Sequence, residues 1–298
     1  MKTAINGAFA ALTIALVTAP AAQAGTVGQA GLGERVSVSG RGVASGQDGA
    51  GMGVRFTERT TVTRDGKGQD GGPDGKSQDG GPDGKSQDGG RDGKSTLLQR
   101  RTGVFQFGKD GIAAWDISSR PGNSPDMPTD LFSPRRTIRI GITSYVSGGS
   151  YGKRLPQGKT WYRTDQDLTD ASGQFGQIVN VAEPATLGTL LRSAKNSGST
   201  YSGTVTFGEL AAISHWFRTT LPVRADDKTT VTFKLTLDRD RHPRRLTTSW
   251  AATGVVNGGG WEGKTVGVET RFSGWGGKVT VKAPPASAVS TKLASGGK

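Results

Sequence analysis

The chain has 298 residues, of which 38 are lysine or arginine and 25 are aspartate or glutamate, so its formal net charge is +13. A chain of this length can bury a sizeable core, and a basic balance favours contact with anionic polymers or membrane surfaces. The sequence contains no cysteine, which excludes disulfides, lipid-modified cysteines and metal sites built on thiolates.

The first 24 residues have the pattern of a secretory signal peptide. Lys2 precedes a mostly apolar run from Ala4 to Pro20, and Ala22-Gln23-Ala24 follows. A basic start, a short apolar stretch and an Ala-x-Ala site are typical of a cleaved signal, and a membrane anchor would need about 20 apolar residues. We therefore expect cleavage after Ala24 and a secreted, extracytoplasmic protein without a transmembrane segment. Loss of Lys2 would lower its formal charge from +13 to +12.

Residues 25–50 are rich in Gly, Ser and Gln, and we expect a disordered leader there. A domain over residues 51–289 follows, and residues 290–298 are expected to form a flexible tail. Residues 64–95 interrupt this domain with a nonapeptide repeat that restarts at Asp74 and Asp83. The repeat has no apolar side chain except proline, so burial cannot offset the entropy of ordering it. We interpret it as a disordered hairpin insertion, because a calcium-binding roll needs an apolar residue in each repeat.

Most of the remaining domain alternates apolar and polar side chains. In a strand this period of two buries one face and exposes the other, so the runs predict antiparallel strands in a sheet with one apolar face. The stretch from Arg136 to Val146 is either a pair of strands broken near Gly141 or one bent strand. The other predicted strands are Val54–Thr63, Leu97–Phe107, Ile112–Ile117, Lys159–Thr164, Tyr201–Phe207, Val231–Leu237, Leu246–Ala252, Val266–Val268 and Val279–Val281.

Two segments have the three-to-four-residue spacing of amphipathic helices. Glu183–Lys195 begins with Pro184 in its first turn and carries a stripe of leucines, and Gly208–Phe217 forms a second helix or a pair of turns. We predict an α+β fold in which a curved antiparallel sheet of about eight or more strands packs both helices on its apolar face.

Catalytic signatures are missing from the sequence. Its two histidines lie in different settings, His215 as a packing residue on the second helix and His242 in a turn. Asp238 and Asp240 alternate with arginines and are interpreted as solvated hairpin charges. A Gly-x-Ser-x-Gly elbow and a phosphate-binding loop are both absent. We expect no enzyme activity, no catalytic residue, no cofactor and no metal; a hydrolase remains a remote alternative.

Five segments, in this order and spacing, resemble the LolA/LppX-like (LppX/LprG-type) envelope proteins of Gram-positive bacteria. They are Lys159–Arg163, Glu183–Leu191, Tyr201–Phe207, His242–Trp250 and Thr270–Pro285. The resemblance implies a half-barrel of antiparallel strands around helices on its concave face, with lipids or lipoproteins carried in the hollow by some members. Gly25 follows the expected cleavage site, so this chain would be a secreted member without a lipobox cysteine.

Two functions stay open. The first is a secreted, non-enzymatic carrier of an apolar, lipid-like ligand in the cell envelope. The expected lining residues are Phe105, Phe107, Ile140, Leu187, Leu191, Val205, Phe207, Phe233, Leu235 and Trp250. The alternative is a module with a packed core that binds anionic wall polymers or a protein partner through its basic surface. A dry cavity of about 300–1,000 Å³ favours the carrier. Nucleic-acid binding is not expected, because no recognition motif is present, and we expect a monomer.

Overall fold

The computed structural model describes residues 51–64, 95–122, 134–165, 176–221, 227–254 and 261–294. The predicted signal peptide, the predicted leader and the repeat between residues 65 and 94 lie outside these ranges, as does the end of the predicted tail. In the part of the chain that is described, no helix combines the length and apolarity that crossing a bilayer requires.

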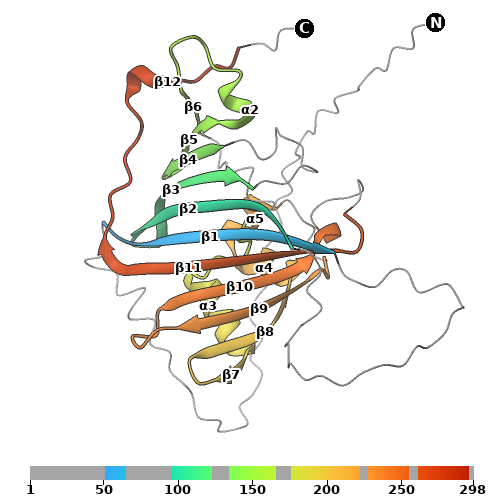
Figure 1. Cartoon of the computed structure of the whole chain (residues 1–298). Helices are drawn as coiled ribbons and strands as arrows, with labels where there is room; N and C mark the ends of the chain where they lie inside the picture. The colour runs from blue at the N-terminus through green and yellow to red at the C-terminus, as the bar shows by residue number, and fades with distance from the viewer. Residues whose placement is uncertain are drawn as a thin grey trace, which may run out of the picture. The chain divides into compact units, whose positions relative to one another are not determined.

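In the described ranges, twelve strands form one open, curved sheet, in the order β12-β6-β5-β4-β3-β2-β1-β11-β10-β9-β8-β7 (Figure 1). Neighbouring strands are antiparallel, except that β12 runs parallel to β6. The predicted antiparallel sheet is therefore confirmed. The strands are β1 (Met52–Arg64), β2 (Thr96–Gly108), β3 (Gly111–Pro121), β4 (Arg135–Ile140), β5 (Thr143–Gly148), β6 (Trp161–Thr164), β7 (Lys195–Ser197), β8 (Thr200–Thr206), β9 (Thr230–Leu237), β10 (Pro243–Ala251), β11 (Lys264–Lys278) and β12 (Val289–Ser290).

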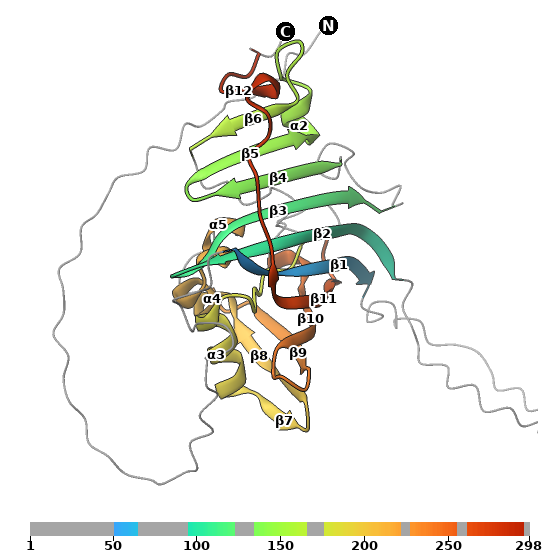
Figure 2. The ribbon, with the colours of Figure 1, turned by 90° about the vertical axis from the view of Figure 1, so that its left-hand side faces the viewer.

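The alternation along the strands gives the sheet two chemically different faces. In β1, Phe56 and Glu58 are buried, whereas Arg55, Thr57 and Arg59 are exposed. We call the side that carries Phe56 the inner face and the side that carries Arg59 the outer face. The helices α3 (Pro184–Ser193), α4 (Phe207–Ile213) and α5 (His215–Thr220) all lie on one side of the sheet (Figure 2).

Aromatic packing identifies the side that these helices cover as the inner face. Trp216 of α5 contacts Phe105 of β2 and Trp115 of β3 edge to face, with each pair of ring centroids 5.5 Å apart. Phe207 and Phe217, at the start of α4 and within α5, also pack together, 5.3 Å apart. These contacts belong to one core cluster that continues over β8 to β11. The prediction that the helices pack on the apolar face is confirmed.

The predicted second helix is divided into two. Ser214 has extended backbone angles (φ −109°, ψ 116°), and its hydroxyl accepts a hydrogen bond from the Phe217 backbone N–H, so it ends α4 and caps α5. Serine is favoured at this position because its side chain satisfies an otherwise free backbone donor. The break turns Trp216 and Phe217 inward and leaves His215 exposed, so the prediction that His215 packs is wrong.

The first predicted helix is shorter than expected, and the residues after it join the sheet. The helix α3 ends at Ser193, and Lys195–Ser197 pair with β8 as the edge strand β7. The stretch from Arg136 to Val146 is a hairpin, because Gly141 has the left-handed angle (φ 60°) that the turn between β4 and β5 requires. Two short helices, α2 (Gly149–Gly152) and the 3₁₀ turn η2 (Ala252–Gly254), follow β5 and β10.

The C-terminal segment ties together two distant parts of the sheet. Residues 279–281, predicted to be a strand, leave the sheet after β11, although Val279 stays buried. The chain then reaches η3 (Ala286–Ala288) and β12, which pairs with β6 (Figure 2). Within the predicted tail, the Ala294 N–H donates a hydrogen bond to the Arg154 carbonyl at 2.7 Å.

Candidate functional site

A buried segment without helix or strand structure crosses the inner face. We call residues 176–183 the strap. Ile178, Val179, Val181 and Ala182 are all 0% exposed, which shows that the strap fills the space between the sheet and the helices. Because a buried backbone needs partners for its N–H and C=O groups, a strap outside the sheet requires side chains or other elements to supply them.

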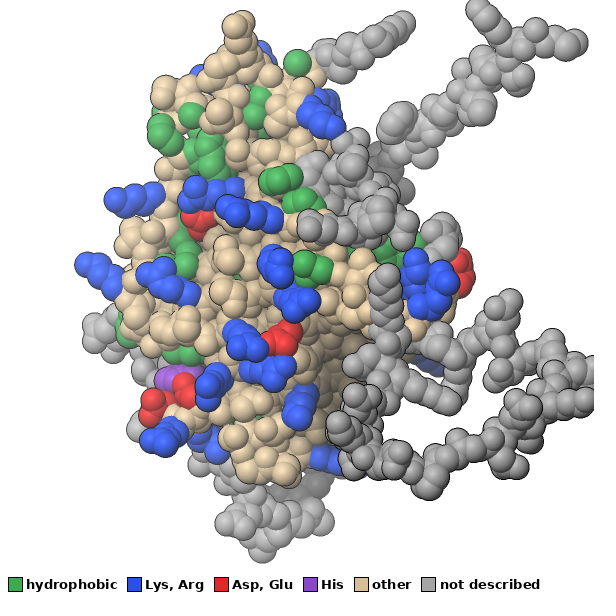
Figure 3. All heavy atoms as spheres, viewed as in Figure 1, with side chains coloured by type: hydrophobic (Ala, Val, Ile, Leu, Met, Phe, Trp, Pro, Cys, Tyr) green, Lys and Arg blue, Asp and Glu red, His purple; other side chains and the backbone are tan. Residues whose placement is uncertain are grey.

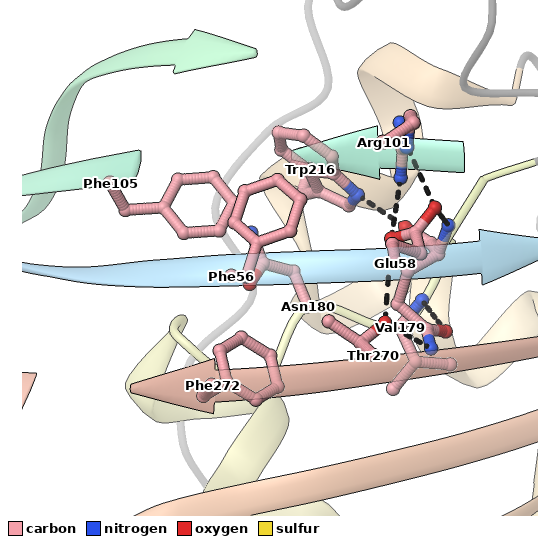
Figure 4. A pocket seen from close by; sticks show the side chains of 10 residues that line it. Phe56, Glu58, Arg101, Phe105, Val179, Asn180, Trp216, Thr270 and Phe272 are labelled. Atoms are coloured by element: carbon pink, nitrogen blue, oxygen red, sulfur yellow. Dashed lines mark hydrogen bonds and ion pairs between the residues drawn. The ribbon is translucent and has the colours of Figure 1, made fainter. Parts of the chain in front are cut away.

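The first of these partners is a buried ion pair on the inner face. Arg101 of β2 donates from Nε and Nη2 to the two carboxylate oxygens of Glu58 of β1, at 2.7 and 2.9 Å. The same carboxylate accepts from the backbone N–H of Gln177 at 3.1 Å. Each side chain of the pair is 1% exposed. The ion pair therefore fixes the start of the strap to two strands (Figure 4).

The Gln177 side chain extends this network to further strands. Its Nε2 donates to Thr270 Oγ1 of β11 at 3.1 Å, and its Oε1 accepts from Thr248 Oγ1 of β10 at 2.9 Å. Its backbone carbonyl accepts from the Trp216 indole N–H at 2.9 Å. Gln177 thus bonds directly to three strands and one helix, and the ion pair adds β2 to the network.

The other end of the strap is held by Glu183. Its carboxylate accepts hydrogen bonds from the Trp216 backbone N–H at 2.8 Å and from the Ser214 and Thr186 hydroxyls. Glu183 is also the N-cap residue of α3, where a negative charge is favourable. It therefore joins the strap, α3 and the start of α5.

A small cavity lies between the strap, the helix α5 and the sheet. Its volume is about 10 Å³, which is enough for about one water molecule. Five of its ten lining residues are polar, and these include the ion pair and Gln177 (Figure 4). The lining residues are Phe56, Glu58, Arg101, Phe105, Gln177, Val179, Asn180, Trp216, Thr270 and Phe272.

The structure brings most of the predicted ligand-lining residues together, but packs them against one another. Seven of them are buried members of the core cluster, namely Phe105, Leu187, Val205, Phe207, Phe233, Leu235 and Trp250. Phe107 and Leu191 are partly buried against that cluster. Ile140 is 36% exposed and lies on the outer face, since it alternates with Arg139 and shares its side of β4 with Arg136. Of the ten, Phe105 lines the cavity described above.

Arginine and hydroxyl side chains dominate the outer face. Figure 3 views the sheet from the side opposite the helices and shows many Lys and Arg side chains with few acidic ones. Arg59 of β1 is in register with Arg100 of β2, which is in register with Arg120 of β3. Two residues further along, Thr57, Thr102 and Ser118 are aligned in the same way. We call these two sets the arginine row and the hydroxyl row.

The carboxylates of the outer face are bound to other arginines. Asp116 accepts two hydrogen bonds from Arg136, which raise the pKa of that guanidinium. Glu269 accepts from Arg245 at 2.7 Å and from Arg271 at 2.6 Å. Partial desolvation raises the pKa of Glu269, but these two arginines outweigh it and hold the pKa below its ordinary value of 4.5.

Within the described part of the chain, several cations of this face have no such partner. Among the described residues, no carboxylate lies within ion-pair distance of Arg55, Arg59, Arg100, Arg120 or Lys234. All five side chains are exposed. The result is a strongly positive, hydrogen-bond-donating surface on a rigid sheet, which is suited to binding an anion.

The hairpin between β9 and β10 holds a second group of polar side chains. Ligand atoms of Asp238, Asp240 and His242 lie within 4.8 Å of one another, a spacing that a divalent ion could bridge. However, the neighbouring positions 239, 241, 244 and 245 are all arginine, which opposes cation binding. Asp238 instead accepts from the His242 backbone N–H at 2.9 Å, as expected for hairpin charges.

Sequence reasoning did not single out the ion pair, Gln177 or the arginine row. A signal for the ion pair was present, because Glu58 and Arg101 fall on the same side of their predicted strands as Phe56 and Phe105. A charge in an otherwise apolar series is a sign of a buried partner. A scan against models of protein families and a search of curated proteins both found no match for this chain.

Proposed function

We propose that this protein is a non-enzymatic, exported module that binds anionic polymers of the cell envelope through the outer face of its sheet. The observation that carries the proposal is a set of exposed cations that have no carboxylate partner among the described residues, namely Arg55, Arg59, Arg100, Arg120 and Lys234. Two carboxylates, Asp116 and Glu269, lie on the same face. They are bound to Arg136, Arg245 and Arg271, so they do not neutralise the five exposed cations.

The packing of the inner face supports the same proposal. A carrier of an apolar ligand needs a hollow of about 300–1,000 Å³, whereas the cavity beside the strap measures about 10 Å³. The strap and the core side chains fill the space between the sheet and the helices, where the resemblance to LolA/LppX-like proteins leads us to expect a lipid. Lipid carriage and membership of that family therefore stay predictions from sequence, with less physical support than polymer binding.

The proposal is tested by measuring the affinity of the purified protein for dextran sulfate and for neutral dextran at several salt concentrations. Binding by charge neutralisation releases counterions, so log K should fall linearly with log salt, and neutral dextran should not bind. Replacing Arg55 and Lys234 with serine should weaken binding and flatten the salt dependence. Serine at Arg192 and Arg218, which lie on α3 and α5 across the sheet, is the charge-matched control.

The lipid-carrier alternative is tested in parallel by native mass spectrometry of the protein purified from its natural medium. Discrete added masses that an organic solvent extracts, together with salt-independent behaviour toward dextran sulfate, would favour the carrier. Unmodified protein mass together with salt-dependent binding of dextran sulfate supports the proposed polymer-binding module.

A further inference from the structure

The arginine row places three like charges side by side across three strands. Arg59 faces Arg100 and Arg100 faces Arg120 in the antiparallel register, and all three side chains are exposed. Side chains that face each other in such pairs have Cβ atoms about 4.5–5.5 Å apart, and like charges at this distance destabilise a sheet. A local arrangement that opposes stability without a compensating contact is a sign of a binding role.

The neighbouring carboxylate does not relieve this repulsion. On the other side of Arg59, the register places Glu269 of β11 directly beside it. The Glu269 oxygens are nevertheless bonded to Arg245 and Arg271, at 2.7 and 2.6 Å. The arginine row therefore keeps its positive charge, because the neighbouring Glu269 is bonded to Arg245 and Arg271 instead.

The hydroxyl row supplies a second line of donors parallel to the first. Thr57, Thr102 and Ser118 lie two residues from the three arginines on the same face, which corresponds to about 7 Å along each strand. Threonine and serine hydroxyls can donate to anionic oxygens that the guanidinium groups do not reach. Both rows run across the strands, so together they form a track for an extended anion.

The geometry points to a phosphate-bearing polymer as the ligand of this track, an inference that rests on the proposed function. A guanidinium donates two parallel hydrogen bonds to a phosphate or a carboxylate. A carboxylate has only two oxygens, and both lie in one plane, so its donors must approach within that plane, as Arg245 and Arg271 do at Glu269. The oxygens around phosphorus are tetrahedral, so one phosphate can bridge two neighbouring arginines of the row, or an arginine and a hydroxyl. Successive phosphates would then run from β3 to β1.

The inference is tested with long-chain inorganic polyphosphate and with poly-glutamate of matched charge as probes. We expect the natural protein to bind polyphosphate at least tenfold more tightly than poly-glutamate at the same salt concentration. Arg100→Lys keeps the charge but removes the planar fork, so it should abolish most of this preference while poly-glutamate binding is kept. The triple change Arg59→Gln, Arg100→Gln and Arg120→Gln should weaken polyphosphate binding far more than Arg192→Gln with Arg218→Gln.

The outcomes separate the two proposals. Equal affinity for both polymers, or an Arg100→Lys protein that keeps the full preference, would overturn the phosphate inference and leave the proposed polymer binding intact. Binding of neither polymer would overturn both. The triple variant should melt at the same or a higher temperature than the natural protein, because it loses like-charge repulsion, so its loss of binding cannot be attributed to unfolding.

Discussion

Arg101 and Glu58 form an ion pair inside the core, with Arg101 Nε 2.7 Å and Nη2 2.9 Å from the two carboxylate oxygens. The carboxylate also accepts the Gln177 backbone N–H, so the pair organises the strap as well as two strands. Transfer of two charges out of water is unfavourable, and a buried pair adds little net stability over a packed apolar pair. The ion pair instead holds the strap against the sheet, in the space between the sheet and the helices.

The ion pair gives the first prediction. Glu58→Ala should lower the free energy of unfolding by about 3–5 kcal/mol, because it leaves the Arg101 charge buried without its main partner. Replacing both residues together, as Glu58→Leu with Arg101→Met, should recover most of that loss. Urea denaturation measures both variants. Glu262→Ala, at an exposed turn, is the control and should stay within about 0.5 kcal/mol of the natural protein. A Glu58→Ala protein of natural stability would contradict the described network.

A glycine at the start of the strap gives the second prediction. A Cβ atom on Gly176 would lie 2.2 Å from the Arg101 guanidinium carbon, which Glu58 holds in place. Gly176→Ala should therefore cost about 1–3 kcal/mol through overpacking. Gly188→Ala is the matched control within α3, where an added methyl meets only the mobile end of Arg192 at 3.3 Å. It should stabilise the protein by about 0.5–1 kcal/mol, because alanine favours a helix. In thermal melting, we expect Gly176→Ala to lower the melting temperature and Gly188→Ala to raise it.

The acid beside the arginine row gives the third prediction. Glu269→Gln removes the charge that holds Arg245 and Arg271, so these arginines become available to an anion. The affinity for polyphosphate should rise and its salt dependence should steepen by roughly 0.7 per added phosphate contact. Stability should change by less than about 1 kcal/mol, because the pairs are solvent-exposed. Asp116→Asn, which releases Arg136, should act in the same direction. Weaker binding in both variants would contradict the assignment of the outer face.

The pH dependence of binding gives the fourth prediction. The pKa of Glu269 is held below its ordinary value of 4.5 by Arg271 and Arg245 against the opposing effect of desolvation. A lowered carboxyl pKa stabilises the fold above pH 4.5, and that contribution is lost as the pH falls through the folded-state value. Protonation also frees the two arginines. The affinity advantage of Glu269→Gln over the natural protein should therefore persist at pH 4.5 and shrink toward zero only as the pH falls through the lowered folded-state pKa. An advantage that already disappears above pH 4.5 would contradict the lowered pKa and the restraint of these arginines by Glu269.

The sheet and its buried faces could be predicted because each strand carries the information in its own alternation. The strand from Val231 to Leu237, for example, has four apolar residues on one side, and all four are buried. The break between two helices was harder to predict from the sequence. Ser214 ends α4 and caps α5 through one hydroxyl hydrogen bond, and the apolar stripe continues on both sides of it.

The candidate site could not be predicted because it depends on register between distant strands. Arg59 and Arg100 are separated by the repeat, and a bulge next to Thr60 shifts the pairing beyond them. A one-residue change in that register would place each arginine beside a different neighbour. The strap could not be predicted either, because its apolar run around Ile178 has neither the period of two of a strand nor the period of 3.6 of a helix.

Arginine footprinting measures most directly whether the outer face binds the anionic polymer. The protein is treated with an arginine-selective dicarbonyl reagent with and without polyphosphate, and the modified residues are quantified by mass spectrometry. We expect the polymer to protect Arg59, Arg100 and Arg120, whereas Arg192 and Arg218 on the helices should react equally in both samples. Protection of the two helix arginines with unchanged reactivity of the arginine row would contradict it.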